Sequence, residues 1–415
     1  MISTLNIINL FFPRDTKRRS LFKKAYYSIH SFLPRLSYNF RDCKVSLLKL
    51  STKVNQKKSG QVLVFDHKMG GGSNIYRDSI AKKYIEKGMD VILVIYNYKD
   101  RCYIIRYNGR QKSVILDKQA VILYEFIQIL TVQDIVINDL VSFPEPENLL
   151  RLVLELKENM GCRLAIPLHD YYPICPSYNL LDINYKYCGL PPIEICENCL
   201  AATKLEEILH KPDSIASWRI IWRKALASAD EIILFSKSSG ELLLKAYPGL
   251  TDSVLKLRPH KVDYIKEVVP LRINKKIIIG IPGNINLAKG SGIVAEMIEL
   301  IENDSTNNAE IVIIGILADI YCRSPRLAIT GNYRREHLSR IIESYKINMI
   351  FIPSIWPETF SFTTEEAILT GLPVAAFRIG APAERLGNYS KAVIIDEISS
   401  NAAYDMIVEY FSHNK

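Results

Sequence analysis

Short apolar runs alternate with helix-like spans along this sequence of 415 residues, and the alternation starts twice. The first series comprises Val62–Phe65, Val91–Tyr96 and residues 134–140, 163–170 and 231–236; the second comprises residues 276–283, 310–315, 347–353 and 373–377. Short runs that are mostly apolar are typical of strands buried on both faces of a parallel sheet. The sequence therefore predicts an α/β fold with two doubly wound, Rossmann-like domains that face a common cleft.

The same pattern sets the predicted domain boundaries. A polar, proline-flanked stretch separates the two series and is taken as a linker at residues 263–275. An N-terminal domain at 58–262 precedes it, and a C-terminal domain at 276–395 follows it. Residues 1–57 are predicted to be a basic helical extension, and residues 396–415 a last helix that could return to the N-terminal domain.

The net charge of +9 is concentrated near the N-terminus. Residues 1–60 contain 13 lysines and arginines and 2 acidic residues, whereas the remainder has 40 basic and 42 acidic residues and is close to neutral. Aromatic residues such as Phe22, Tyr26 and Phe32 are interleaved with these cations. Such a segment can lie on an anionic membrane surface, or it can cover the first domain as a helix. No pattern elsewhere in the sequence indicates nucleic-acid binding.

Three glycines, Gly70 to Gly72, follow the first predicted strand and precede a helix. Their spacing does not match G-x-G-x-x-G and no P-loop motif occurs, which disfavours NAD and P-loop nucleotide sites. The turn is either a plain tight turn or a place where the backbone of Gly71 and Gly72 approaches a substrate. The loop GNINLAKGSG carries Lys289, which is either one exposed lysine among many or a point charge for a diphosphate.

The stretch PSIWPETFSFTTEEAILTGLPVAAFRIGAPAE, residues 353–384, resembles the donor-site signature of the retaining GT-B glycosyltransferases of family four. The family pattern reads P-E-x-F-G, then E-A-x-x-x-G-x-P-V, then G-x-x-x-E. The residues that fit it are Pro357, Glu358, Phe360, Glu366, Ala367, Gly371, Pro373, Val374, Gly380 and Glu384. GNINLAKG and ADEIILFSKSSGELLLKAYPG are similar to two further parts of the family, so that the resemblance extends over residues 61–395.

The resemblance implies a GT-B fold, a nucleotide-diphosphate sugar as donor and roles for particular residues. Glu358 would contact hydroxyls of the donor sugar, Glu366 would accept hydrogen bonds from the ribose, and Lys289 would neutralise the diphosphate. The backbone N–H groups of Phe360, Ser361 and Phe362 would meet the sugar and diphosphate at a helix start. The remaining candidates are His169 near the donor sugar, and Thr363, Gly283, Asn284, Gly71 and Gly72 in the donor site.

A simpler interpretation exists for part of this stretch, and two positions depart from the family pattern. Thr363 followed by Glu366 has the spacing of a helix capping box, which would account for Glu366 but not for Glu358. Ser361 stands where the family commonly has glycine. Asn284 stands where the family usually has arginine, so that one diphosphate cation is missing and Arg258 or another arginine would have to replace it.

Four of the eight cysteines, Cys175, Cys188, Cys196 and Cys199, are clustered in an insert predicted at residues 171–203. The spacing C-x12-C-x7-C-x2-C ends in one half of a common tetrahedral zinc site. The insert has few periodic apolar residues, so that a metal would supply stability that a core does not. An iron–sulfur cluster also takes four thiolates, and free buried thiols are the third possibility.

These inferences combine into a retaining glycosyltransferase whose catalysis needs no metal, with zinc as a structural ion. It would transfer a hexosyl or related sugar to a glycan or lipid-linked acceptor in cell-surface polysaccharide assembly, such as O-antigen of lipopolysaccharide or capsule. Because the N-terminus lacks the order of a secretory signal, the protein is expected to be cytoplasmic and peripheral on the inner membrane face. The alternative is a weak or inactive GT-B-like scaffold with a zinc site.

Overall fold

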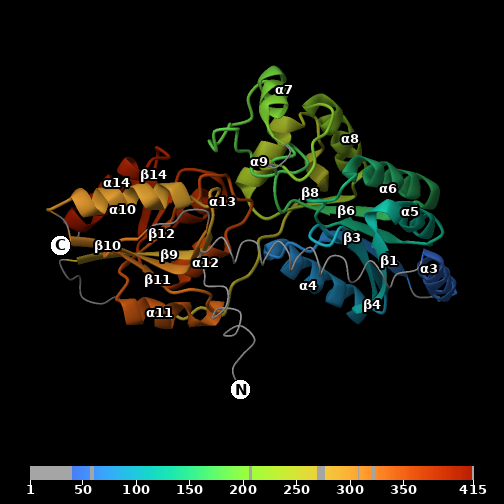
Figure 1. Cartoon of the computed structure of the whole chain (residues 1–415), viewed down its shortest axis with the longest axis horizontal. Coiled ribbons are helices and arrows are strands. Elements are labelled where there is room, and N and C mark those ends of the chain that lie inside the picture. The colour runs from blue at the N-terminus through green and yellow to red at the C-terminus, as the bar shows by residue number, and fades with distance from the viewer. Residues whose placement is uncertain are drawn as a thin grey trace, which may run out of the picture. The chain divides into compact units, whose positions relative to one another are not determined.

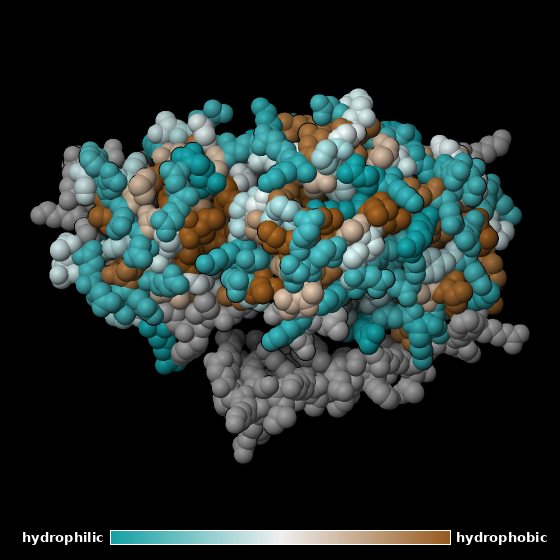
Figure 2. All heavy atoms as spheres, turned by 90° about the horizontal axis from the view of Figure 1, so that it is seen from above, coloured by the Kyte–Doolittle hydropathy of each residue, from teal (hydrophilic) through white to brown (hydrophobic). Residues whose placement is uncertain are grey.

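A computed structural model describes residues 40–56, 60–204, 208–268, 276–306, 308–318 and 323–413. The basic residues before Phe40 lie outside this part of the chain, and so do Phe22, Tyr26 and Phe32. Among the described residues, no helix combines the length and apolarity needed to cross a membrane. On the face drawn in Figure 2, hydrophilic residues cover much of the surface and hydrophobic residues form separate patches between them.

The strands form two sheets, as the two series of apolar runs predicted (Figure 1). One sheet has eight strands in the order β4-β3-β2-β1-β5-β6-β7-β8, and the other has six in the order β11-β10-β9-β12-β13-β14. The prediction of an α/β protein with two Rossmann-like sheets is confirmed. The strands are β1 (Gln61–His67), β2 (Asp90–Asn97), β3 (Cys102–Tyr107), β4 (Arg110–Leu116), β5 (Asp134–Ile137), β6 (Arg163–Pro167), β7 (Glu231–Leu234), β8 (Leu255–Leu257), β9 (Lys276–Ile285), β10 (Asn308–Leu317), β11 (Leu327–Ile329), β12 (Met349–Ile352), β13 (Val374–Phe377) and β14 (Ala392–Ile395).

The chain divides into two compact units, the first made of residues 1–69 and 77–133 and the second of residues 70–76 and 134–415. In the first unit, β1 is buried throughout and pairs in parallel with β2. β2 and β3, and then β3 and β4, pair antiparallel. The sequence analysis missed this meander, although Asn108 and Gly109 connect β3 to β4 at φ angles of 45° and 79°. An Asn-Gly pair in that conformation is the preferred two-residue hairpin turn.

Helix α3 (Phe40–Asn55) belongs to the core of the first unit. Leu47, Leu50 and Val54 recur at helical spacing along it and are buried, where they face α5 (Ala120–Gln128) and β4. Asn55 Nδ2 donates to the carbonyl oxygen of Ile129 at 2.6 Å, which ties the end of the helix to the loop after α5. The basic extension predicted to end at residue 57 therefore contains a packed helix in its last third.

The second unit contains β5 to β8 and the whole six-stranded sheet. Every strand pair described within it is parallel. Both faces of the six-stranded sheet carry buried apolar clusters, one around Ile281 and Phe351 and the other around Ile350 and Val374. Burial on both faces is the reason why these strands appear in the sequence as continuous apolar runs.

The C-terminal helix α14 (Ser400–His413) packs on the six-stranded sheet beside α10 (Ser291–Asn303). Its residues Ala403, Tyr404, Ile407 and Phe411 recur at helical spacing and are buried in the cluster of that sheet. The structure thus places this helix with the C-terminal sheet and not on the N-terminal domain. The remaining α-helices are α4 (Gly72–Glu86), α6 (Pro146–Met160), α7 (Ile193–Ala202), α8 (Ile215–Ser228), α9 (Lys237–Ala246), α11 (Leu338–Tyr345), α12 (Phe362–Leu369) and α13 (Gly380–Leu386).

Candidate functional site

The strand order of the six-stranded sheet reverses between β9 and β12. In doubly wound sheets, ligands bind at such a reversal, outside the carboxyl ends of the strands. The loop after β9 carries Lys289 and the loop after β12 carries Glu358. Lys289 Nζ lies 3.2 Å from Oε1 and 3.3 Å from Oε2 of Glu358, so the structure brings these two predicted residues together. The Glu358 side chain is 4% exposed and that of Lys289 is 36% exposed, which leaves the ammonium group accessible from solvent.

Two glycines hold the loops that carry this pair. Gly290 has a φ of 82°, and a Cβ atom there would lie 2.0 Å from the carbonyl oxygen of Pro353. Gly380 has a φ of 59°, and a Cβ atom there would lie 2.5 Å from the backbone of Pro357. Only glycine fits such a contact at a positive φ. The backbone that leads into Glu358 is therefore fixed by the close approach of other loops.

Helix α12 begins at Phe362 and is capped by Ser361. Ser361 Oγ accepts a hydrogen bond from the Thr364 N–H at 3.3 Å and lies 3.1 Å from Thr363 Oγ1. The capping box of Thr363 and Glu366 is therefore wrong, since the cap comes two residues earlier. Ser361, one of the two departures from the family pattern, has a local role because its side chain satisfies a helix N–H group.

Glu366 points into a cluster of partners that the sequence analysis did not find. Its Oε1 atom accepts a hydrogen bond from the Tyr264 hydroxyl and lies 3.7 Å from Arg335 Nε. The side chain is 1% exposed. Burial raises the pKa of Glu366 above its usual value, and the Tyr264 hydrogen bond and the charges of Arg335 and Lys289 partly offset this effect. A buried carboxylate with these neighbours is a strong acceptor for a ligand hydroxyl.

Arg335 is a cation near Glu366 that was not predicted from the sequence. Its guanidinium carbon lies 4.8 Å from the centre of the Phe362 ring, at the start of α12. It therefore places a second cation near the N-terminus of α12, where the helix dipole already favours an anion. No motif marks Arg335 in the sequence, because it lies in the short helix Arg335–His337 after β11, far from the signature.

His169 follows β6, as predicted, and its Nε2 atom lies 3.2 Å from Asn138 Oδ1. Asn138 Nδ2 donates to the carbonyl oxygen of Ser73 at 3.1 Å, so that Oδ1 is the free acceptor of the amide. His169 Nε2 is therefore the protonated nitrogen in this arrangement. The backbone oxygen of His169 accepts a hydrogen bond from Thr359 Oγ1 at 2.6 Å, which joins the end of β6 to the residue after Glu358.

An aromatic cluster surrounds His260, which lies between β8 and β9. The His260 ring stacks on Phe235 at 4.3 Å and contacts the rings of Phe360 and Phe362 at 4.8 and 4.9 Å. Burial lowers the pKa of His260 to about 4, so the ring is neutral at physiological pH. The rings of Phe360 and Phe362 are thus held in place at the start of α12 by His260 and by each other.

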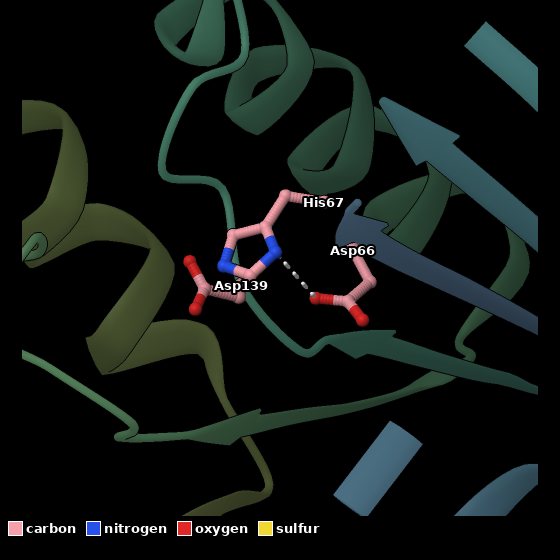
Figure 3. Close-up of side chains that lie close together, drawn as sticks. All are labelled: Asp66, His67 and Asp139. Atoms are coloured by element: carbon pink, nitrogen blue, oxygen red, sulfur yellow. Dashed lines mark ion pairs between the residues drawn. The ribbon is translucent and has the colours of Figure 1, made fainter. Parts of the chain in front are cut away.

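The glycine turn after β1 lies beside helix α12, whereas the end of β1 carries a carboxylate that is paired with an arginine. Gly71 has a φ of 86° and is open on its outer side, and a Cβ atom on Gly72 would lie 3.0 Å from the Phe362 ring. The turn therefore reaches the start of α12. At the end of β1, Asp66 pairs with Arg77 Nη1 at 2.8 Å. Its Oδ1 atom also lies 3.9 Å from His67 Nδ1, and Asp139 lies on the other side of the imidazole ring (Figure 3). This arginine already balances the Asp66 carboxylate.

Four further positions named in the sequence analysis have distinct environments. A Cβ atom on Gly283 would lie 3.6 Å from Thr363 Cγ2, so this glycine lies beside the start of α12. Asn284 is exposed. Arg258, suggested as a substitute cation, pairs with Glu231 instead. Glu384, the last residue of the signature, accepts hydrogen bonds from the Lys237 and Ser238 N–H groups at 2.9 and 2.8 Å, which satisfies the start of α9.

The four clustered cysteines lie on one helix and two loops. Cys196 and Cys199 are in α7, one turn apart, and Cys175 and Cys188 precede that helix. Burial raises the pKa of the Cys175 thiol to about 11, with smaller contributions from Cys188 and Cys196. Cys188 in turn interacts with Cys196 and Cys199. In the described part of the chain, no three of these sulfur atoms lie within 4.8 Å of one another.

Comparisons with known proteins give a fold but no sequence family. No family model and no curated protein matches the sequence. Sucrose-phosphate synthase from Thermosynechococcus elongatus superposes with a TM-score of 0.55 at 13% identity, over 85% of this chain and 90% of that one. HepE from Anabaena, in complex with UDP-glucose, gives a TM-score of 0.54 at 14% identity, over 85% of this chain and 90% of that one.

A third similar structure is the lipopolysaccharide outer core galactosyltransferase WaaB, with a TM-score of 0.52 at 10% identity. The match covers 85% of this chain and 91% of that one. At such identities the likeness establishes the fold, which is the GT-B fold of these glycosyltransferases. The chain therefore has the architecture that the signature around Glu358 implied.

Proposed function

We propose that the protein is a retaining glycosyltransferase that transfers a sugar from a nucleotide-diphosphate sugar to a glycan or lipid-linked acceptor, without a metal ion in catalysis. The observation that carries the proposal is the Lys289–Glu358 pair, at 3.2 Å, at the strand-order reversal beside the N-terminus of α12. A sugar needs hydroxyl acceptors and a diphosphate needs cations and N–H donors. This site offers all three within one loop cluster.

In the proposed mechanism the protein acts mainly by electrostatic stabilisation. The acceptor oxygen forms a bond to the anomeric carbon as the bond between that carbon and the diphosphate oxygen breaks. Negative charge grows on the leaving diphosphate, which takes up the proton that the acceptor hydroxyl loses. Lys289 and the N–H groups at the start of α12 stabilise that charge, while Glu358 accepts hydrogen bonds from sugar hydroxyls and orients the ring. His169 would lie next to the donor, with its ring oriented by the contact of Nε2 with Asn138 Oδ1. Retention rests on the family resemblance of the signature.

Two buried hydroxyl groups support a ligand at these helix starts. Ser291 Oγ, in the first turn of α10, and Thr364 Oγ1, in the first turn of α12, have no hydrogen-bond partner among the described residues. Buried hydroxyl groups normally have one. Both helices follow the loops that carry Lys289 and Glu358. A phosphate or sugar oxygen at this place would supply the missing acceptors.

The proposal is tested by incubating the full chain with a panel of UDP- and GDP-sugars and measuring nucleotide release, beginning with UDP-glucose because HepE was solved with it. A nucleotide at about 100 times its Kd should add about 2.7 kcal/mol of stability, which a thermal shift detects. Release or stabilisation with one donor supports the transferase. Folded protein that neither binds nor turns over any donor supports the scaffold alternative.

Arg335 is proposed to supply the diphosphate cation that Asn284 does not. We expect Arg335→Gln to weaken nucleotide-diphosphate binding about 10- to 100-fold, because a hydrogen bond to a charged group contributes about 1.5–3 kcal/mol. Binding of the free nucleoside should change little. Calorimetric titration with the diphosphate and the nucleoside measures both. Arg340→Gln, on the exposed side of the neighbouring helix α11, is the matched control, and an equal loss in both variants would argue against the assignment.

The acceptor and the place of action are inferred from the charge distribution. A basic segment before Phe40, on a chain that is otherwise close to neutral, fits a lipid-linked acceptor at the cytoplasmic face of a membrane, as in O-antigen or capsule assembly. WaaB, an outer core galactosyltransferase of lipopolysaccharide, acts in a comparable class of pathway.

Deletion of residues 1–38 is expected to abolish sedimentation with anionic vesicles at low salt while the melting temperature stays unchanged. The cut leaves α3 intact, with its buried Leu47, Leu50 and Val54. A deletion through residue 57 should instead lower the melting temperature, because it removes that buried face. Vesicle binding that persists without residues 1–38, or that is insensitive to salt, would exclude electrostatic attachment by this segment.

A further inference from the structure

Residues 171–203 form a part of the chain with little regular structure. Between β6 and α8 the elements are α7 and a single bridge between Leu181 and Tyr187. The local buried cluster contains three residues, Leu200, Ile208 and Ile215, with Cys175 and Cys196 packed against them. The segment also buries other apolar side chains against the rest of its domain, namely those of Tyr171, Tyr172, Ile174, Leu180, Leu181 and Leu190.

The backbone of this segment is also strained. Tyr178, Leu180, Tyr185 and Leu190 have φ angles of 50°, 57°, 56° and 55°. The left-handed region is unfavourable for residues with a Cβ atom, and it persists when surrounding structure enforces it. These residues make up half of the eight non-glycine residues at positive φ in the described chain, and they lie between Cys175 and Cys196. Leu180 and Leu190 are themselves buried, and an ion held by the cysteines around this loop would add a further constraint.

The thiols occupy the ends of the strained loop. Cys175 N–H donates to the Tyr171 carbonyl oxygen at 2.9 Å and Cys188 N–H to the Leu180 carbonyl oxygen at 3.0 Å, so both thiols lie on hydrogen-bonded turns. Cys196 and Cys199 are separated by three positions in α7 and therefore share a helix face. Cys175 and Cys196 pack against the same buried cluster, which brings the loop after β6 next to α7.

Helix α8 is joined to α7 by hydrogen bonds and brings the guanidinium group of Arg219 close to the sulfur atom of Cys196. The Glu197 carboxylate accepts hydrogen bonds from the Ile215 and Ala216 N–H groups at 3.0 and 2.8 Å, which joins α7 to the start of α8. Arg219 Nη2 lies 3.6 Å from Cys196 Sγ and can donate to it, while its Nε donates to the Ile174 carbonyl oxygen at 3.1 Å. An arginine that donates to a sulfur atom stabilises the thiolate form, and outer hydrogen-bond partners orient metal ligands.

We propose that Cys175, Cys188, Cys196 and Cys199 bind one structural Zn²⁺ ion, with Arg219 as a positioning residue for the Cys196 thiolate. The four thiolates and the ion carry a net charge of −2, which Arg219 partly balances. Because Zn–S bonds are about 2.3 Å long, the sulfur atoms must move closer than their present spacing, in which no three lie within 4.8 Å of one another. Binding would release the thiol protons to solvent and lock the strained loop.

The experiment uses the full chain purified without chelators, with metal content measured by mass spectrometry. We expect about one zinc per chain, and near zero in a variant that combines Cys196→Ser with Cys199→Ser. Cys162→Ala is the matched control, because Cys162 is a buried free thiol that lies before β6 and outside residues 171–203, and this variant should keep its zinc. Protein prepared with Co²⁺ should show the visible absorption of tetrahedral cobalt thiolates, which tests the site even if the double variant does not fold.

Arg219→Met should raise the rate or extent of zinc loss to a chelator about 10- to 100-fold, as removal of an outer hydrogen-bond partner does in other metal sites. Iron with acid-labile sulfide in the purified protein would replace zinc by an iron–sulfur cluster and overturn the proposal. Folded protein that contains no metal, and in which Cys175, Cys188, Cys196 and Cys199 all react with a thiol reagent, would also overturn it. Equal zinc content in the wild type and the double variant would place the ion elsewhere.

Discussion

Substitution of Glu358 by glutamine is expected to lower sugar transfer, measured as nucleotide release in the presence of acceptor, by about 10²- to 10³-fold. Glutamine keeps the size of the side chain but removes the charge that faces Lys289 at 3.2 Å. The amide is a weaker acceptor for sugar hydroxyls, and Lys289 loses the partner that orients it toward the diphosphate. The melting temperature should change little, because Lys289 remains in contact with solvent.

Glu365→Gln is the matched control for this variant. Glu365 is in the first turn of α12 and pairs with Arg385, so the same change of charge occurs close by without touching the Lys289–Glu358 pair. Its rate of transfer should stay within about threefold of the wild type, since an ion pair of this kind contributes about 1 kcal/mol or less. Near wild-type transfer in Glu358→Gln would show that the donor sugar binds elsewhere.

Glu366→Gln is expected to separate stability from donor binding. Burial raises the pKa of Glu366, so the stability that this group contributes is present below its unfolded value, about 4.5, and is lost as the pH rises through the higher folded value. Glutamine has no such titration and can still accept from Tyr264. At neutral pH the variant should be at least as stable as the wild type, yet bind the nucleotide about 10- to 100-fold more weakly.

The measurement is the free energy of unfolding by urea between pH 4 and pH 8, together with nucleotide titration at pH 7. The difference in stability between variant and wild type should move in favour of the variant as the pH rises through this range. Glu365→Gln again serves as the control and should show no gain toward higher pH. A variant that loses stability at neutral pH and keeps its nucleotide affinity would contradict both parts of the prediction.

Much of the fold could be predicted because local sequence patterns indicate where its strands and helices lie. Strands such as β1 and β12 are buried on both faces, so that they appear as short apolar runs. The β3–β4 hairpin was not predicted, because Arg106, Arg110 and Lys112 interrupt the apolar pattern of its strands. Only Asn108-Gly109 marks the turn. The place of α14 could not be predicted either, because an apolar helix face shows that the helix is packed but not which sheet it packs on.

Some residues of the candidate site could be predicted from local patterns, and others could not. Lys289, Glu358 and the residues from Phe360 to Glu366 belong to contiguous stretches that a signature can describe. Tyr264 reaches Glu366 from 102 residues away, and Arg335 comes from a loop without any motif. Contacts of this kind depend on how distant loops pack, which no local pattern encodes. The cap at Ser361 was missed for a smaller reason, an error of two residues at a helix start.

The contacts of Gly290 with Pro353 and of Gly380 with Pro357 bear on how the substrate range of this protein could be changed in the laboratory. A mutant library that randomises every residue near Glu358 would be dominated by clones that no longer express, because any side chain at either glycine meets backbone atoms. Restricting the diversity to Thr359, Ser361 and Thr363 keeps both glycines and alters the side chains around the start of α12. Clones with a new sugar preference should come from those positions, whereas sequences recovered after selection for expression alone should retain both glycines.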